Sequence, residues 1–207
     1  MTNKLKNNKK ISIFGYGSLV NSKTRKITLK KNSKAIPVLF KDPKFTRKWI
    51  CLKNNKSNKK RSVLTLCKNK KSKKNINGVL FSVNNKLLKK LNKRESAYNL
   101  IKLNNNHFTS FNNKKIPKQP IYSYISKKKY KYPNKNCKVN QYYIDVTIDG
   151  LSKYGKKFTN EFNTTIKKKY IKNTRKYKNI KKRFNFIKKI NTKKIDKIIK
   201  QINLNKN

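Results

Sequence analysis

One apolar strand of the sequence ends in a glycine-rich loop with the composition of an anion site. Residues 14–19 read FGYGSL and directly follow the apolar residues 11–13. The chain has only five glycines, and Gly15 and Gly17 both lie in this loop. Glycine admits positive φ and lets a ligand approach the backbone, so several N–H groups can line one concavity. The loop is therefore a candidate cradle for a carboxylate, to which the Ser18 hydroxyl adds one hydrogen bond.

Glu95 is the candidate acid–base group. It is one of only six carboxylates in 207 residues, and it lies in the segment 91–98 (LNKRESAY) near the end of a predicted helix. The helix dipole mildly disfavours a carboxylate at that end. Spacing alone favours a simpler interpretation, in which Glu95 is a surface residue paired with lysine or arginine.

Other chemical motifs are incomplete. Gly15 and Gly17 begin like a dinucleotide-binding fingerprint, but position 20 is valine and no βαβ unit follows. Ser18 is not at the centre of a nucleophile elbow. The single histidine, His107, lies in an asparagine-rich stretch and is interpreted as an exposed loop residue. One histidine and three scattered cysteines lack the paired spacing of a zinc site, so no metal is predicted.

The large positive charge of the chain does not by itself identify a binding partner. Lysine and arginine total 59 against six carboxylates, which gives a formal net charge of +53. Such a composition by itself indicates disorder or a nucleic-acid arm. Lysine, asparagine and isoleucine are enriched together, however, as AT-rich coding would produce, and the apolar residues still come in strand-like groups. We expect weak, salt-dependent binding to nucleic acid or anionic membranes, and we infer no specific protein partner.

The sequence predicts a reducing compartment. The longest apolar stretch, residues 11–20, is too short to cross a membrane. The first ten residues are basic but lack the apolar core of a secretory signal. Cys51, Cys67 and Cys137 are odd in number and widely spaced, which favours reduced thiols. We therefore expect a cytoplasmic location or an organelle interior.

Residue periodicity predicts an α+β fold. Leucines spaced three or four apart predict a helix over 84–99, and a second helix is predicted over 151–166. Pro37 is expected at an edge or at a strand entry, and Gly78 at a bulge or beside a close neighbour. Short polar loops favour antiparallel pairing in a small barrel or strongly curled sheet. The predicted strands are 11–14, 35–40, 45–52, 61–67, 76–83, 100–103, 121–125 and 141–148.

The composition divides the chain into three parts. Residues 1–10 form a polar basic leader, residues 11–165 one domain, and residues 166–207 a basic helical extension with isoleucines at near-helical spacing. We expect the extension to pack loosely on the domain. The alternative is an anchor for RNA or for a membrane surface.

The order of these motifs resembles the γ-glutamylcyclotransferase-like family, which includes ChaC-type and AIG2-like proteins. The loop 14–19 resembles the family's substrate loop, and residues 48–49 with 62–66 resemble its next strands. Residues 76–83 resemble the strand that enters the catalytic helix, and 88–98 the segment with the catalytic glutamate. The resemblance covers about residues 11–103, with a looser similarity over 141–162, and the basic extension is not part of the family pattern.

The resemblance implies a small, curled, mixed β-barrel with a few helices and an enzyme without metal or cofactor. Its substrate would be a γ-glutamyl amine or peptide, with glutathione as one candidate, and the product 5-oxoproline. Glu95 would take a proton from the α-amine and return it to the leaving amine. The implied substrate-binding residues are Tyr16, Gly17, Ser18, Leu19, Tyr98 and Tyr143, with Tyr142 as the alternative to its neighbour. The rival function is a non-enzymatic protein that uses its basic surface to hold nucleic acid or anionic membrane.

Overall fold

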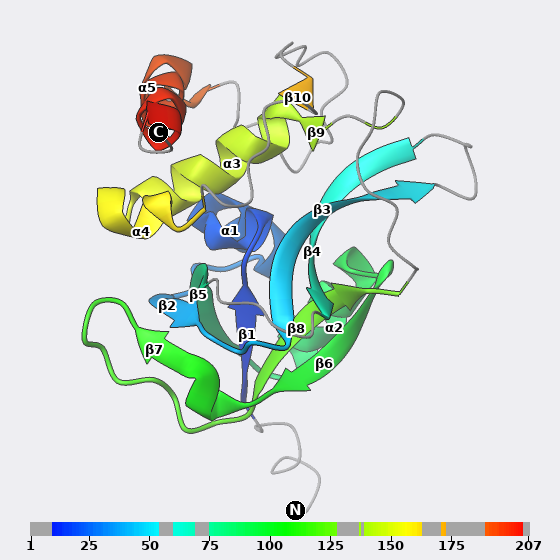
Figure 1. The fold of residues 1–207 in the computed structure, drawn as a ribbon. Coiled ribbons are helices and arrows are strands. Elements are labelled where there is room, and N and C mark those ends of the chain that lie inside the picture. Colours follow the sequence, from blue (N-terminus) through cyan, green and yellow to red (C-terminus); the bar gives the residue numbers. More distant parts are fainter. Residues whose placement is uncertain are drawn as a thin grey trace, which may run out of the picture.

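The computed structural model describes residues 10–53, 60–68, 75–127, 137, 139–162, 171–172 and 189–204. Its centre is a six-stranded sheet in the order β6-β8-β1-β5-β2-β7 (Figure 1). Neighbouring strands are antiparallel except β1 and β8, which are parallel. The strands are β1 (Ile11–Gly15), β2 (Ile36–Phe40), β5 (Ile76–Val83), β6 (Tyr98–Leu103), β7 (Phe108–Ser110) and β8 (Ile121–Ser126).

A long hairpin of β3 (Phe45–Lys53) and β4 (Lys60–Lys68) curls over the sheet on the side of β8 (Figure 1). The backbone N–H of Ser126 in β8 donates to Thr65 Oγ1 in β4 at 2.9 Å. The described strands thus form an open sheet with a separate hairpin, not one closed barrel. The predicted α+β class is confirmed.

In the part of the chain that the structure describes, five helices and two short 3-10 turns surround these strands. Helix α3 runs across the molecule above α1, and α5 lies beside α3 (Figure 1). A short parallel pair of strands, β9 and β10, lies at the start of α3. The elements are η2 (Ser18–Val20), α1 (Ser22–Leu29), α2 (Asn85–Arg94), η3 (Asn105–His107), β9 (Val139–Asn140), α3 (Gln141–Ser152), α4 (Lys156–Asn160), β10 (Ile171–Lys172) and α5 (Thr192–Leu204).

Aromatic side chains fill the core below β1. The Phe14 ring lies 5.5 Å from the ring of Phe40 and 5.1 Å from that of Phe108. A Cβ added to Gly78 would lie 2.4 Å from the Phe14 ring and 2.7 Å from the Gly15 carbonyl oxygen. The close neighbour predicted for Gly78 is therefore confirmed, and the two strands meet here because a side chain is absent.

The strand predicted over 141–148 is wrong, because these residues begin helix α3. Their β-branched and aromatic side chains favour a strand by propensity. In the fold, however, the helix is buried on most of its surface, and Asp145 and Thr147 are buried together with Ile144 and Val146. A helix covered on several sides has no simple apolar stripe to reveal its period. The same burial explains why the sequence's alternation was misleading.

Pro37 was expected at a sheet edge or at a strand entry, and the entry is observed. Strand β2 lies between β5 and β7, and Pro37 is its second residue.

Helix α1 was not predicted, since its sequence SKTRKITL has few apolar residues. The Asn21 side chain accepts from the Lys23 N–H at 3.0 Å and caps this helix.

The expectation of three reduced thiols is wrong, because Cys51 and Cys137 form a disulfide. The two residues are 86 positions apart in the sequence, and the bond links β3 to the segment before β9. Wide spacing in the sequence does not exclude a disulfide, because the fold brings Cys51 of the hairpin beside Cys137. Cys67 is buried and is not part of this disulfide. The compartment stays a prediction.

The C-terminal segment contributes to the same core as the sheet. Ile190 and Ile195 are 8% and 1% exposed and belong to the main apolar cluster. The predicted boundary at residue 165 and most of the leader 1–10 lie outside the described residues. The division into leader, domain and extension therefore stays a prediction.

Candidate active site

A cavity of about 180 Å³ lies where β1 ends. It is lined by the loop residues Tyr16 to Leu19 on one side and by Glu95 on the other. The same cavity is lined by Tyr98 and Tyr143. The fold thus brings together all seven residues that the sequence analysis proposed for the site.

The loop is formed by β1 running directly into the 3-10 turn η2. The Val20 N–H donates to the Gly17 carbonyl at 2.9 Å and closes the turn. Gly17 has φ −126°, so a positive φ is not the reason for glycine at this position. A Cβ at Gly17 would lie 3.0 Å from the Tyr143 hydroxyl. Glycine is needed here for space beside the cavity.

Three arginines from three elements hold this loop, in a chain that has six arginines in total. Arg25 Nη1 of α1 donates to the carbonyls of Leu19 and Val20, both at 2.8 Å. Arg47 Nη1 of β3 donates to the Tyr16 carbonyl at 3.3 Å. The third arginine is Arg94 of α2. The contacts of Arg25 and Arg47 hold the backbone carbonyl groups of the loop in place.

Arg47 is buried yet charged at neutral pH. Burial lowers its pKa to about 9, which still leaves the guanidinium protonated at pH 7. It also donates to the carbonyl and side-chain oxygens of Asn77, both at 2.8 Å, and lies 4.5 Å from the centre of the Phe162 ring. The loop is therefore backed by positive charge that solvent screens little.

Glu95 is the C-terminal capping residue of α2. Its N–H donates to the Leu91 carbonyl at 2.8 Å, which ends the helix and turns the side chain into the cavity. The side chain is 15% exposed, and Oε1 lies 2.7 Å from Arg94 Nε. That N–H is not aligned on the oxygen as a hydrogen bond, so the contact is an ion pair. The carboxylate therefore lies in the cavity wall beside a fixed positive charge.

Tyrosines form much of the cavity wall. Of the two adjacent candidates, Tyr143 lines the cavity; its hydroxyl oxygen lies 3.5 Å from the Ser18 nitrogen, and its ring meets Trp49 edge-on. The Tyr16 hydroxyl donates to the Tyr124 carbonyl. Burial raises the pKa of Tyr143 and of Tyr16, so both are neutral hydroxyls at physiological pH. They can orient a ligand but carry no charge.

Sequence reasoning missed Arg94, Tyr124 and the two arginines below the loop. Arg94 stood beside Glu95 in the quoted motif, so its position was a usable signal. Tyr124 lines the cavity, and its hydroxyl donates to Asn92 Oδ1 at 2.6 Å. Nothing in the local sequence around Arg25 or Arg47 links them to the loop. Their role depends on contacts between distant segments.

His107 was predicted to be an exposed loop residue, but it is partly buried and ends the 3-10 turn η3. Its Nε2 lies 3.7 Å from Asp42 Oδ2, and its ring meets Phe40 edge-on. Neither His107 nor Asp42 lines the cavity beside β1. The pair therefore belongs to the opposite end of β2 and not to the site.

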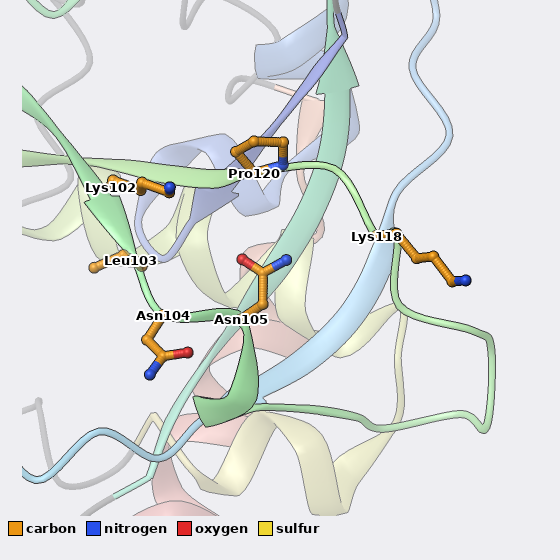
Figure 2. A pocket seen from close by; sticks show the side chains of 6 residues that line it. All are labelled: Lys102, Leu103, Asn104, Asn105, Lys118 and Pro120. Carbon is orange, nitrogen blue, oxygen red and sulfur yellow. The ribbon is translucent and has the colours of Figure 1, made fainter.

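A larger groove of about 540 Å³ lies at the far end of the sheet, between the end of β6 and the loop before β8. Figure 2 shows that Lys118 points away from the other side chains that line it. Lys102, Asn104 and Asn105 provide amide and ammonium groups but no acid or base suited to proton transfer. This groove carries no arrangement for catalysis.

A third cavity, of about 200 Å³, lies between α4 and α5. Residues 150–156 have the glycine and lysine spacing of a P-loop, but position 157 is lysine where serine or threonine is required. Gly150 lies inside α3, and the segment does not follow a strand. The phosphate-binding interpretation therefore fails.

Within the described ranges, no three potential metal ligands among histidine, cysteine, aspartate and glutamate lie together. None of the helices in that part of the chain is both long and apolar enough to cross a bilayer.

Solved structures with the same fold give the comparison with known proteins. No family model matches the sequence, and a search of curated proteins found no match. A structure named gamma-glutamyl cyclotransferase aligns with a TM-score of 0.61 and 13% identity, over 87% of this chain and 99% of that one. The uncharacterized protein loc79017 from Homo sapiens aligns over the same shares with a TM-score of 0.62 and 13% identity.

A third structure, YkqA from Bacillus subtilis, aligns with a TM-score of 0.53 and 16% identity, over 75% of this chain and 53% of that one. At these identities the likeness establishes the fold and not the activity. The chain has the gamma-glutamyl cyclotransferase-like fold that the sequence motifs predicted.

Proposed function

We propose that this protein cyclises a γ-glutamyl amine or peptide and releases 5-oxoproline. One observation carries the proposal: the Glu95 carboxylate and the loop from Tyr16 to Leu19 line the same cavity. The likeness of the fold to a protein named gamma-glutamyl cyclotransferase supports it. Glutathione is one candidate substrate.

Binding comes first in this mechanism. The loop N–H groups and the Ser18 hydroxyl would hold the α-carboxylate of the substrate, with the guanidinium groups behind the loop attracting the negative charge. The neutral hydroxyl of Tyr143 and the ring of Tyr98 would confine the γ-glutamyl chain. Because the reaction is intramolecular, the main task is to fold that chain so that its amine faces its own γ-carbonyl.

Glu95 would then transfer protons between the two nitrogens. The α-ammonium group gives one proton to the carboxylate, and the free amine attacks the γ-carbonyl carbon to form the new C–N bond. The bond from that carbon to the leaving nitrogen breaks as the leaving nitrogen takes this proton from Glu95. The ring nitrogen loses a second proton when it becomes an amide, and Glu95 passes that proton to the released amine, which departs as an ammonium ion. No water is consumed, and Glu95 returns to its starting form.

The test is an assay of the purified protein on a panel of γ-glutamyl amines and peptides. Release of 5-oxoproline and free amine in equal amounts from at least one compound is the expected result. A panel without any 5-oxoproline would reject the proposal. Full-length protein in both oxidised and reduced form should be assayed, because the disulfide lies near the wall that carries Tyr143.

A second candidate function, nucleic-acid binding, is favoured by where the charges lie. None of the six carboxylate residues is fully exposed to solvent: Asp42 and Asp145 are buried, and the other four are partly buried. Helices α1 and α2 pack together, contain no carboxylate, and expose five lysines. We call this the α1–α2 surface; it is defined by Lys23, Lys26, Lys86, Lys89 and Lys93.

Matched charge removal tests this second function. Replacing Lys26, Lys89 and Lys93 with glutamine should weaken binding to a single-stranded RNA and lower the salt slope by about 2. The control removes three exposed lysines from the loop before β8, namely Lys114, Lys115 and Lys118. Equal effects of the two variants would mean that the charge acts without a defined surface. Binding to anionic vesicles but not to RNA would reject the nucleic-acid assignment.

A further inference from the structure

The Arg94 side chain joins the loop, Glu95 and helix α1. Its Nη2 donates to Ser18 Oγ at 2.8 Å, and its Nη1 donates to Thr28 Oγ1 at 2.6 Å. Its Nε forms the ion pair with Glu95 at 2.7 Å. The side chain is only 7% exposed, and Arg94 lines the cavity. One guanidinium thus fixes both halves of the proposed site.

The contact with Ser18 has a direction. A guanidinium has no acceptor, so the Ser18 oxygen must accept from Arg94. A hydroxyl has a single proton, and acceptance leaves that proton available to donate elsewhere. Ser18 lines the cavity together with Tyr143, and its side chain also contacts the Tyr143 hydroxyl. The remaining Ser18 proton can therefore turn from Tyr143 to an anion that binds in the cavity. Removing Arg94 would let the hydroxyl turn and accept instead.

The contact with Thr28 anchors the guanidinium. Thr28 Oγ1 accepts from Arg94 and donates to the Thr24 carbonyl at 3.0 Å, so both sides of this hydroxyl are satisfied. The fork of the guanidinium is therefore held in one plane by α1 while it points to Ser18. Lysine has a single nitrogen on a flexible stem and cannot reproduce three contacts in fixed directions.

The amino-acid usage of the chain supports a specific need for arginine. Lysine outnumbers arginine 53 to 6, yet the cavity lining among the described residues contains Arg94 and no lysine. Three arginines reach the loop, but Arg25 and Arg47 donate to its backbone carbonyls. Arg94 contacts the side chain that faces the cavity. It differs from the other two in acting on a group that a ligand can touch.

We propose that Arg94 is a positioning residue that makes the site selective for γ-glutamyl compounds with a free α-carboxylate. Arg94 acts through Ser18, because its hydrogen bond keeps the Ser18 hydroxyl oriented as a donor. Its ion pair with Glu95 also fixes the position of the carboxylate relative to the loop. This inference rests on the proposed function, because it assumes that a γ-glutamyl compound occupies the cavity. A purely structural link between α1 and α2 is the competing explanation.

Binding to a non-reacting variant separates the two explanations. Glu95→Gln is the background, and calorimetry gives the affinity for a γ-glutamyl dipeptide and for the same compound with its α-carboxylate converted to an amide. We expect the free acid to bind about 10-fold more tightly, as for a charge-assisted hydrogen bond. Adding Arg94→Lys should reduce this preference to less than threefold. The control is Lys90→Met, which removes another contact between α2 and α1, from Lys90 Nζ to the Leu29 carbonyl at 3.4 Å, and should preserve the preference.

The outcomes are distinct. The inference is overturned if Arg94→Lys leaves the preference intact, or if Lys90→Met reduces it equally. It is also overturned if neither compound binds. If Arg94→Lys fails to fold, Ser18→Ala replaces it and should lose the same preference. A wild-type chain that releases no 5-oxoproline, while the Arg94-dependent preference persists, would reject the cyclisation and retain Arg94 as the selector of the carboxylate.

Discussion

The cavity beside β1 and the α1–α2 surface come from the same lysine-rich sequence, yet they carry charge differently. The surface exposes five lysines and no carboxylate. The cavity has one cation and one anion, Arg94 and Glu95, held 2.7 Å apart, and no lysine among its lining residues. Exposed lysines are solvated and interchangeable, whereas a buried guanidinium must have its partners in fixed directions.

This contrast shows that amino-acid composition describes the surface of the protein but not its candidate site. A charge of +53 describes the solvent-facing residues, where a change of side chain alters little except long-range attraction. Inside the site each charged group has named partners, so a single substitution removes several contacts. The substitutions below are therefore expected to affect function and stability in the interior far more than on the surface.

The largest effect is expected for Glu95→Gln. The amide keeps the shape of the side chain but cannot take up the proton, so the rate of 5-oxoproline release should fall by about 10²-fold or more. The measurement is kcat at saturating substrate. Asp196→Asn in helix α5 is the control and should keep full activity; similar rates in wild type and Glu95→Gln would remove the base from the mechanism.

The disulfide should contribute next. It links β3 to the segment before β9 and α3, so its loss frees a long loop in the unfolded chain and loosens the wall with Tyr143. Reduction should cost about 2–4 kcal/mol of unfolding free energy. Urea unfolding with and without reductant measures this. The double variant Cys51→Ser with Cys137→Ser is the control and should not respond to reductant; if the wild type also fails to respond, the bond does not form in solution.

Gly78 lies in the core and Gly17 beside the cavity, so substituting each one separates an effect on packing from an effect on the site. Gly78→Ala would push a Cβ into the Phe14 ring and the Gly15 carbonyl, and should destabilise the fold by about 1–3 kcal/mol. In Gly17→Ala the tightest contact is with the Tyr143 hydroxyl at 3.0 Å, so activity should fall more than stability. Thermal unfolding and turnover of both variants give the comparison. The opposite ranking would contradict the assigned positions of the two glycines.

The smallest effect concerns alkaline pH. Burial raises the pKa of Tyr16 and Tyr143 in the folded chain above the ordinary value of 10. Their contribution to stability is therefore complete below about pH 10 and is lost as the pH rises above it, because only the unfolded chain releases these protons readily. Urea unfolding at pH 8 and pH 11 should show the decline, and Tyr16→Phe should reduce it. A decline that is the same in Tyr16→Phe would assign it to other groups.

Local sequence was enough for most of the sheet and for the position of the loop. Residues 76–83 and 121–125 are rich in the branched and aromatic side chains that are typical of strands. Gly15 and Gly17 marked the turn after the first strand. Helix α3 was misassigned because its burial on several sides hides its period. The disulfide and the arginines below the loop depend on which distant segments meet, and local patterns do not contain that information. The resemblance of the motif order to a known family singled out Glu95 as the candidate acid–base residue. Its spacing in the sequence alone favoured a surface residue.

The central claim is that the substrate closes a ring on itself, and isotope labelling tests it most directly. A γ-glutamyl compound that the enzyme accepts should be turned over in water enriched in ¹⁸O, with the products analysed by mass spectrometry. Attack by the substrate's own amine predicts 5-oxoproline without ¹⁸O, in an amount equal to the released amine. Glutamate containing ¹⁸O would show that water is the nucleophile and would contradict the proposed role of the site.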